Sequence, residues 1–107
     1  MTTFDSREKA FESKFAHDAE MQFKAEARRN RLLGLWAAEK MGLSGDTADA
    51  YAKSVILADF EEAGDEDVYR KVAGDLAERN AADEREIRAK MRELMIEAKA
   101  QLVSEAG

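Results

Sequence analysis

Apolar residues recur at helical spacing through most of this chain, and no proline interrupts them. The clearest run advances by 4, 3, 4 and 4 residues, a seam typical of packed helices: Ile87, Met91, Leu94, Ala98 and Leu102. Strong helix formers dominate and β-branched residues are scarce, so strands are disfavoured. The sequence therefore predicts an all-α fold, and 107 residues favour a single domain.

Glycines and polar caps mark the ends of the expected helices. Gly42 suits the left-handed position that follows a helix, with Leu43 placed to fold back over its last turn. Asp65 is placed to be an N-cap, and Asp83 with Glu86 has the spacing of a capping box. The expected helices cover residues 6–41, 47–62, 66–79 and 84–103. Because the connections are short, neighbouring helices should be antiparallel, as in a four-helix bundle.

The N-terminal residues differ from the rest. Phe4, Phe11 and Phe15 share one narrow stripe of a helix, on a segment too short to be stable alone. We expect residues 1–18 to be a flexible, conditionally helical arm, and residues 19–107 to be the bundle domain. Each buried ring could contribute roughly 1.5–3 kcal/mol, so the arm needs a second contact to bind tightly. Alternatively, the rings pack on the protein's own bundle.

Charge and composition exclude several classes of function. The net charge is −6, and residues 44–107 carry 9 basic and 16 acidic side chains, which argues against nucleic-acid binding. No apolar run approaches 18 residues and no signal segment is present, so we expect a cytoplasmic protein that is not inserted in the membrane. Phosphate loops and nucleophile elbows are absent, so we expect no enzyme, no catalytic residue and no cofactor.

No metal site is expected either. His17 is the single histidine and cannot build a multi-histidine zinc site, although it could sense pH where the arm meets the bundle. The acidic residues between positions 59 and 67 lack the ligand spacing of a calcium-binding loop. Caps and solvated charges explain them better.

A basic cluster beside the single tryptophan suggests an alternative function. Three arginines could bind a phosphate while an indole stacks on a base. The residues are Arg28, Arg29, Arg31 and Trp36. They are compatible with a bundle that binds a small anionic ligand such as a purine nucleotide. The competing interpretation is a solvated helix face with the tryptophan in the core.

Two strings of the sequence carry a resemblance to a known family. Residues 4–18, FDSREKAFESKFAHD, resemble the amino terminus of the zeta inhibitor subunit of alphaproteobacterial F-type ATP synthases. The similarity continues through FKAEARRN at 23–30 and LGLWAA at 33–38, and then at 51–52, 58–60 and 64–68. It therefore covers essentially the whole chain.

The resemblance implies a regulatory partner and a mode of action. Members of the family are four-helix proteins whose arm wedges between the catalytic α and β subunits and the central γ subunit, and blocks rotation in the hydrolysis direction. Such a protein would be cytoplasmic and peripheral to the membrane-bound synthase. The implied partner-binding residues are Phe4, Asp5, Arg7, Glu8, Lys9, Phe11, Glu12, Lys14 and Phe15. The chain departs from the family at Ser6, often acidic, and at Ala63, often proline.

Overall fold

The computed structural model describes residues 18–59 and 65–106. Within these residues the elements are α2 (Ala19–Lys40), α3 (Gly45–Ala58), α4 (Glu66–Ala77) and α5 (Glu84–Ala106). No strand occurs in these two stretches. The prediction of an all-α fold built from four helices is therefore confirmed for the part of the chain that the structure describes.

α2 begins at Ala19, inside the stretch that was predicted to be one helix. A single helical stretch over residues 6–41 is wrong at Asp18, whose backbone is extended (φ −121°, ψ 101°). The side chain of Asp18 accepts a hydrogen bond from the Met21 backbone N–H at 3.1 Å and so caps α2. Asp5 and Glu8 also have the spacing of a capping box, but both lie outside the described residues.

Two helices end in the same way, through a residue in the left-handed region. After α2, Gly42 has φ 78°, and the Leu43 N–H donates to the Ala38 carbonyl at 2.8 Å. This confirms the predicted helix end. After α4, Asn80 has φ 49° and the Ala81 N–H donates to the carbonyl five residues back. Asparagine is one of the few non-glycine residues that adopt this conformation readily.

The remaining boundaries follow the predictions within a few residues. α3 begins two residues early, at Gly45, and it ends at Ala58, four residues before the predicted end near residue 62. Asp65 occupies the N-cap position of α4, but its side chain makes no capping hydrogen bond. At α5 the Glu86 N–H donates to Asp83 Oδ1 at 2.9 Å, as predicted. The Glu86 carboxylate pairs with Lys40 Nζ at 2.8 Å and thereby ties α5 to α2.

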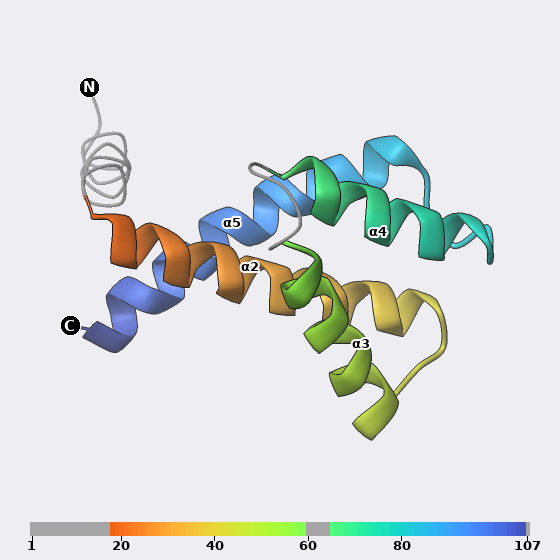
Figure 1. Cartoon of the computed structure of the whole chain (residues 1–107), viewed down its shortest axis with the longest axis horizontal. Coiled ribbons are helices and arrows are strands. Elements are labelled where there is room, and N and C mark those ends of the chain that lie inside the picture. Colours follow the sequence, from red (N-terminus) through yellow and green to blue (C-terminus); the bar gives the residue numbers. More distant parts are fainter. Residues whose placement is uncertain (1–17, 60–64, 107) are drawn as a thin grey trace.

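The helices enclose one core. Each helix runs roughly opposite to the one before it, and α2 and α5 cross obliquely (Figure 1). The N-terminal half of α2 lies beside the C-terminal half of α5, whereas α3 and α4 cover the other halves. All four helices supply buried residues, which are Leu33, Ala37, Val55, Val68, Val72, Leu76, Ile87, Met91 and Leu94.

A close approach of α2 and α3 depends on Gly34. A Cβ atom at this position would lie 2.6 Å from the Cα of Ala52 and 3.3 Å from Cγ2 of Val55. Because the nearest atom belongs to the backbone, a side-chain rotation cannot relieve the contact. Glycine and alanine together therefore set the spacing of these two helices.

Candidate functional site

The residues with the strongest sequence-based prediction lie outside the described part of the chain. All nine expected partner-binding residues fall between positions 4 and 15, and His17 also precedes the first described residue. What the structure does describe is the body to which they are attached. That body begins at Asp18, where α2 has its own cap.

An ion pair between a buried arginine and a half-exposed aspartate joins the middle of α2 to the start of α4. Arg29 is only 2% exposed, and its Nη2 donates to Asp65 Oδ1 at 2.8 Å. Its Nε donates to Oδ1 of the neighbouring Asn30 at 2.7 Å. A buried guanidinium needs such partners because burial removes its hydration. The side chain of Asp65 is therefore occupied by Arg29 and not by a capping bond.

Further acidic groups surround this pair. Asp67 is also buried, and Asp59 is half-buried at the end of α3. Burial raises the pKa of Asp59, the carboxylates of Glu26 and Asp67 raise it further, and the Arg29 guanidinium opposes the rise. The cluster thus contains several carboxylates around one buried cation.

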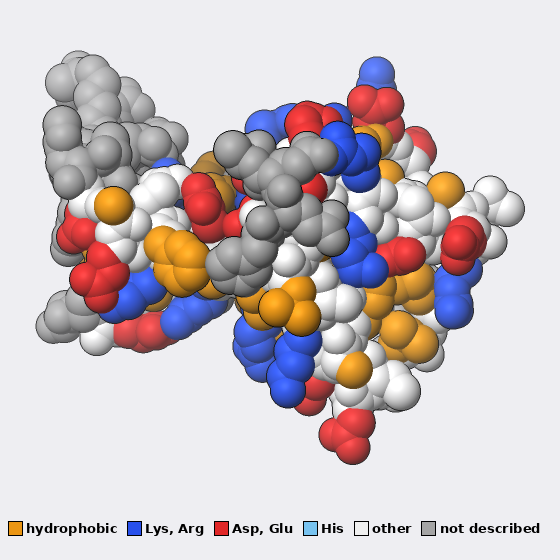
Figure 2. Space-filling model, in the orientation of Figure 1, with side chains coloured by type: hydrophobic (Ala, Val, Ile, Leu, Met, Phe, Trp, Pro, Cys, Tyr) orange, Lys and Arg blue, Asp and Glu red, His pale blue; other side chains and the backbone are white. Residues whose placement is uncertain are grey.

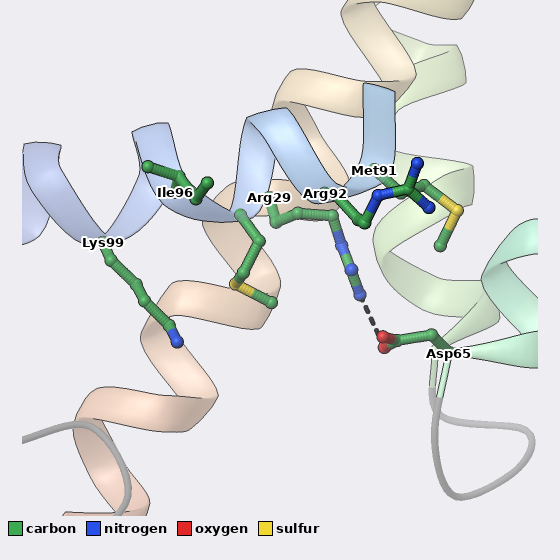
Figure 3. A pocket seen from close by; sticks show the side chains of 7 residues that line it. Arg29, Asp65, Met91, Arg92, Ile96 and Lys99 are labelled. Carbon is green, nitrogen blue, oxygen red and sulfur yellow. Dashed lines mark hydrogen bonds and ion pairs between the residues drawn. The ribbon is translucent and has the colours of Figure 1, made fainter. Parts of the chain in front are cut away.

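A hollow of about 360 Å³ opens beside the ion pair, between α2 and α5 (Figure 3). Figure 3 shows Arg29 reaching across it toward Asp65, with side chains of α5 along the same hollow. From α5 it is lined by apolar and by basic side chains, namely Met91, Arg92, Met95, Ile96 and Lys99. This composition suits an apolar group that carries a negative charge nearby.

The four residues of the predicted nucleotide site contact different parts of the molecule. Arg28 donates to Glu105 of α5, with one N–O distance of 2.9 Å, and this contact lowers the pKa of Glu105. Arg29 pairs with the start of α4, as described above. Arg31 is exposed and lines a shallow hollow with residues of α3. The three guanidinium groups therefore do not converge on one point.

Trp36 packs against the core, as the competing interpretation expected. The ammonium groups of Lys40 and Lys90 lie 5.6 and 5.9 Å from the centre of its ring. Cations at this distance over an indole are attracted to its π-face. Part of the ring also lines a hollow of about 260 Å³ with Glu39 and Lys40.

In residues 18–59 and 65–106, no three His, Cys, Asp or Glu side chains are arranged to hold a metal ion. No helix in that part of the chain has the length and apolar character that a membrane span requires.

Sequence reasoning missed the Arg29–Asp65 pair and the lining of the hollow. The pair joins residues 36 positions apart, and no local pattern reveals which arginine of the basic cluster turns inward. The lining from α5 could have been found, because Arg92, Ile96 and Lys99 recur at steps of four and three residues.

Comparisons with protein families and with solved structures both give a match. A family model described as ATPase inhibitor subunit zeta matches residues 1–101. The chain is also similar to a protein whose structure was solved in solution by NMR, with 64% sequence identity and a TM-score of 0.73. That match covers 79% of this chain and 98% of the other. Comparison with curated proteins gave no match.

Proposed function

Because this chain belongs to the ATPase inhibitor subunit zeta family, we propose that it inhibits ATP hydrolysis by an F-type ATP synthase without catalysing a reaction itself. The single observation that carries the proposal is the extent of the family match. It includes residues 1–18, and therefore every residue predicted to contact the partner. The protein would act in the cytoplasm, peripheral to the membrane-bound synthase.

The proposed mechanism is mechanical. Residues 1–18 insert between the catalytic α and β subunits and the central γ subunit, with Phe4, Phe11 and Phe15 as apolar anchors. Rotation in the hydrolysis direction seats the segment more deeply, whereas rotation in the synthesis direction loosens it. Burial of three rings contributes roughly 5–9 kcal/mol, offset by an ordering cost of about 2–5 kcal/mol.

The helical body has a distinct part in this proposal. It is held together by a core of its own, and α2 is capped at Asp18 without the preceding residues. Such a body can present a short N-terminal segment while remaining too bulky to enter the synthase itself. The domain division at residue 18 is part of the same proposal.

The test measures ATP hydrolysis by the isolated synthase. We expect the wild-type protein to inhibit, and the F4A/F11A/F15A variant to inhibit at least about tenfold more weakly, because the anchors are lost. ATP synthesis driven by a proton gradient should be much less affected by either protein. Equal inhibition of hydrolysis by both proteins would contradict the assignment of the arm.

The purine-nucleotide alternative has weaker support, because its three arginines contact three different elements. The half-exposed Trp36 ring with its two neighbouring lysines is the observation in its favour. A titration of ATP followed by amide NMR shifts tests it. Concerted shifts at Arg28, Arg29, Arg31 and Trp36 would support a common site, and their absence at millimolar ATP would reject it.

A further inference from the structure

One stripe of α5 is basic in a protein that is acidic overall. Its members follow one another at steps of three or four residues and so share one side of the helix: Arg85, Arg88, Arg92, Ile96, Lys99 and Val103. We call these six residues the basic stripe. It contains four cations and no acidic residue, whereas the whole chain has a net charge of −6. The stripe is therefore a local reversal of the protein's charge.

Two of its arginines are available for a partner. Arg85 and Arg92 are exposed, and no ion pair joins either of them to another described residue. Arg88 is held in place, because its guanidinium lies 3.6 Å from the centre of the Tyr69 ring and donates to both carboxylate oxygens of Glu66 at 2.9 and 3.2 Å. The positive charge that the stripe offers to a partner therefore includes Arg85 and Arg92, whereas the charge of Arg88 is already paired with Glu66.

The stripe also carries an exposed apolar side chain. Ile96 is 64% exposed, and charged side chains flank it along the helix. On the face of the molecule in Figure 2, which looks down the shortest axis, hydrophobic side chains are likewise visible among charged ones over α2 and α3. What distinguishes Ile96 is the hollow beside it.

Hollows lie along the stripe and meet at Arg92. The first is the hollow of about 360 Å³ in Figure 3, where Met91 and Met95 provide flexible apolar walls. The second, of about 520 Å³, is lined by Arg85, Arg88 and Arg92 together with Asp83 and Glu84. The first can accept an apolar side chain, and Arg85 and Arg92 can donate hydrogen bonds to carboxylates next to it.

We propose that the basic stripe binds an acidic amphipathic helix of the synthase, with carboxylates facing the arginines and an apolar side chain in the hollow beside Ile96. The inference rests on the proposed function, and it supplies the second contact that a short arm requires. Linking two weak contacts in one chain makes the second one intramolecular and raises the overall affinity. Charge complementarity would also orient the body during association.

A discrete acidic segment fits the charge distribution better than a nucleic acid does. A polyanion would extend past the stripe and meet the acidic remainder of the protein, where repulsion opposes binding. A short helix interacts only with nearby charges, because exposed charges more than about 8 Å apart are largely screened at physiological ionic strength. The favoured partner is therefore a protein segment.

The full-length protein offers a matched pair of variants. In R92E/I96D, both changes fall on the stripe at i, i+4. In K53E/L57D, the same types of change fall at i, i+4 on α3, where Leu57 is also 64% exposed and Lys53 is exposed. All four positions tolerate polar side chains, and thermal unfolding followed by circular dichroism verifies that both variants fold.

The readout is the concentration that half-inhibits ATP hydrolysis by the isolated synthase. We expect R92E/I96D to raise this concentration about tenfold or more, because like charges then face the acidic helix. K53E/L57D should change it less than about threefold. Inhibition by the wild-type protein should weaken with added salt, and R92E/I96D should lose part of that dependence.

Several outcomes would overturn the inference. Unchanged inhibition by R92E/I96D, or an equal loss in both variants, would remove the specific role of the stripe. Stronger inhibition would show that the chain's own arm occupies the stripe, and a changed molecular mass in solution would point to a second copy. If F4A/F11A/F15A loses inhibition but R92E/I96D does not, the proposed function is supported and the proposed role of the basic stripe is rejected. If none of these substitutions weakens inhibition, the proposed function fails as well.

Discussion

At the scale of single residues, Arg29 places a guanidinium in the interior, where it donates hydrogen bonds to Asn30 and Asp65. It is the largest of the fully buried side chains, and it brings a positive charge into the region where α2, α3 and α4 meet. Its charge is balanced by Asp65 and influences Asp59. Because a buried arginine needs a charged partner, the free energy of unfolding depends on its acidic neighbours.

Removal of the partner of Arg29 should destabilise the protein. We expect D65N to lower the free energy of unfolding by about 1–3 kcal/mol, because the buried guanidinium keeps its burial cost but loses a charged acceptor. This expected loss is smaller than the loss for a fully buried ion pair, because the Asp65 side chain is half exposed. Urea unfolding measures the change. D49N, at an exposed position of α3, should stay within about 0.5 kcal/mol of the wild type.

Asp59 makes stability depend on pH in the opposite sense to a normal salt-bridged carboxylate. Its pKa is raised in the folded protein, so the folded state holds the proton more tightly than the unfolded state does. Ionisation of Asp59 therefore destabilises the folded state. This loss of stability is absent when the pH is below 3.8, the ordinary pKa of Asp, and it appears as the pH rises through the raised pKa of the folded protein. It then persists at neutral pH.

D59N should therefore stabilise the protein at pH 7, and this gain should shrink as the pH is lowered toward 3.8. Asp59 also follows α3 directly, and a negative charge at that end of a helix is unfavourable. Urea unfolding of wild type and D59N at both pH values provides the comparison. A gain that is the same at both pH values would refute the pKa argument.

At the scale of elements, the contact of α2 with α3 is set by the absence of a side chain. G34A should cost about 1–3 kcal/mol or more, because the new Cβ would meet the backbone of Ala52 at 2.6 Å and push the helices apart. Gly74 gives a matched control within α4, since a Cβ there would meet nothing within 4 Å. G74A should stabilise the protein by about 0.5–1 kcal/mol. Similar effects of the two substitutions on urea unfolding would contradict this account.

The helix ends show which element boundaries can be predicted from local sequence. The sequence correctly predicted three helix-end features, because a cap depends on residues only a few positions apart. These are the stop at Gly42, the N-cap position at Asp65 and the cap at Asp83. The interruption at Asp18 was missed, since the surrounding residues keep helical composition on both sides. The ion pair of the Asp65 side chain with Arg29 was also missed, because Arg29 lies in another helix.

At the scale of the whole molecule, the body supplies its own stability. The core cluster draws its buried residues from α2, α3, α4 and α5. F4A/F11A/F15A should therefore change the free energy of unfolding by less than about 0.5 kcal/mol while weakening inhibition. L33A, at a fully buried position, should cost about 2–5 kcal/mol and serves as the comparison. A loss of several kcal/mol in the arm variant would mean that its rings belong to the protein's own core.

The candidate sites were predictable to different extents. The family and the nine partner-binding residues of the arm were predicted from strings of sequence. The family match confirms the family, and the nine residues stay a prediction. The basic cluster looked like one anion site, but its arginines lie on different sides of α2 and reach different elements. A helix turns about 100° per residue, so neighbours in sequence need not be neighbours in space.

The sequence by itself determined that the chain is helical, where most of its helices begin and end, and to which family it belongs. These properties depend on periodicity, caps and strings of residues, all of which are local. The tertiary structure alone decided which arginine is buried, that Asp65 is its partner, and that Gly34 allows two helices to touch. Those outcomes depend on which helix faces meet, and the energy of that choice comes from contacts between residues far apart in the chain.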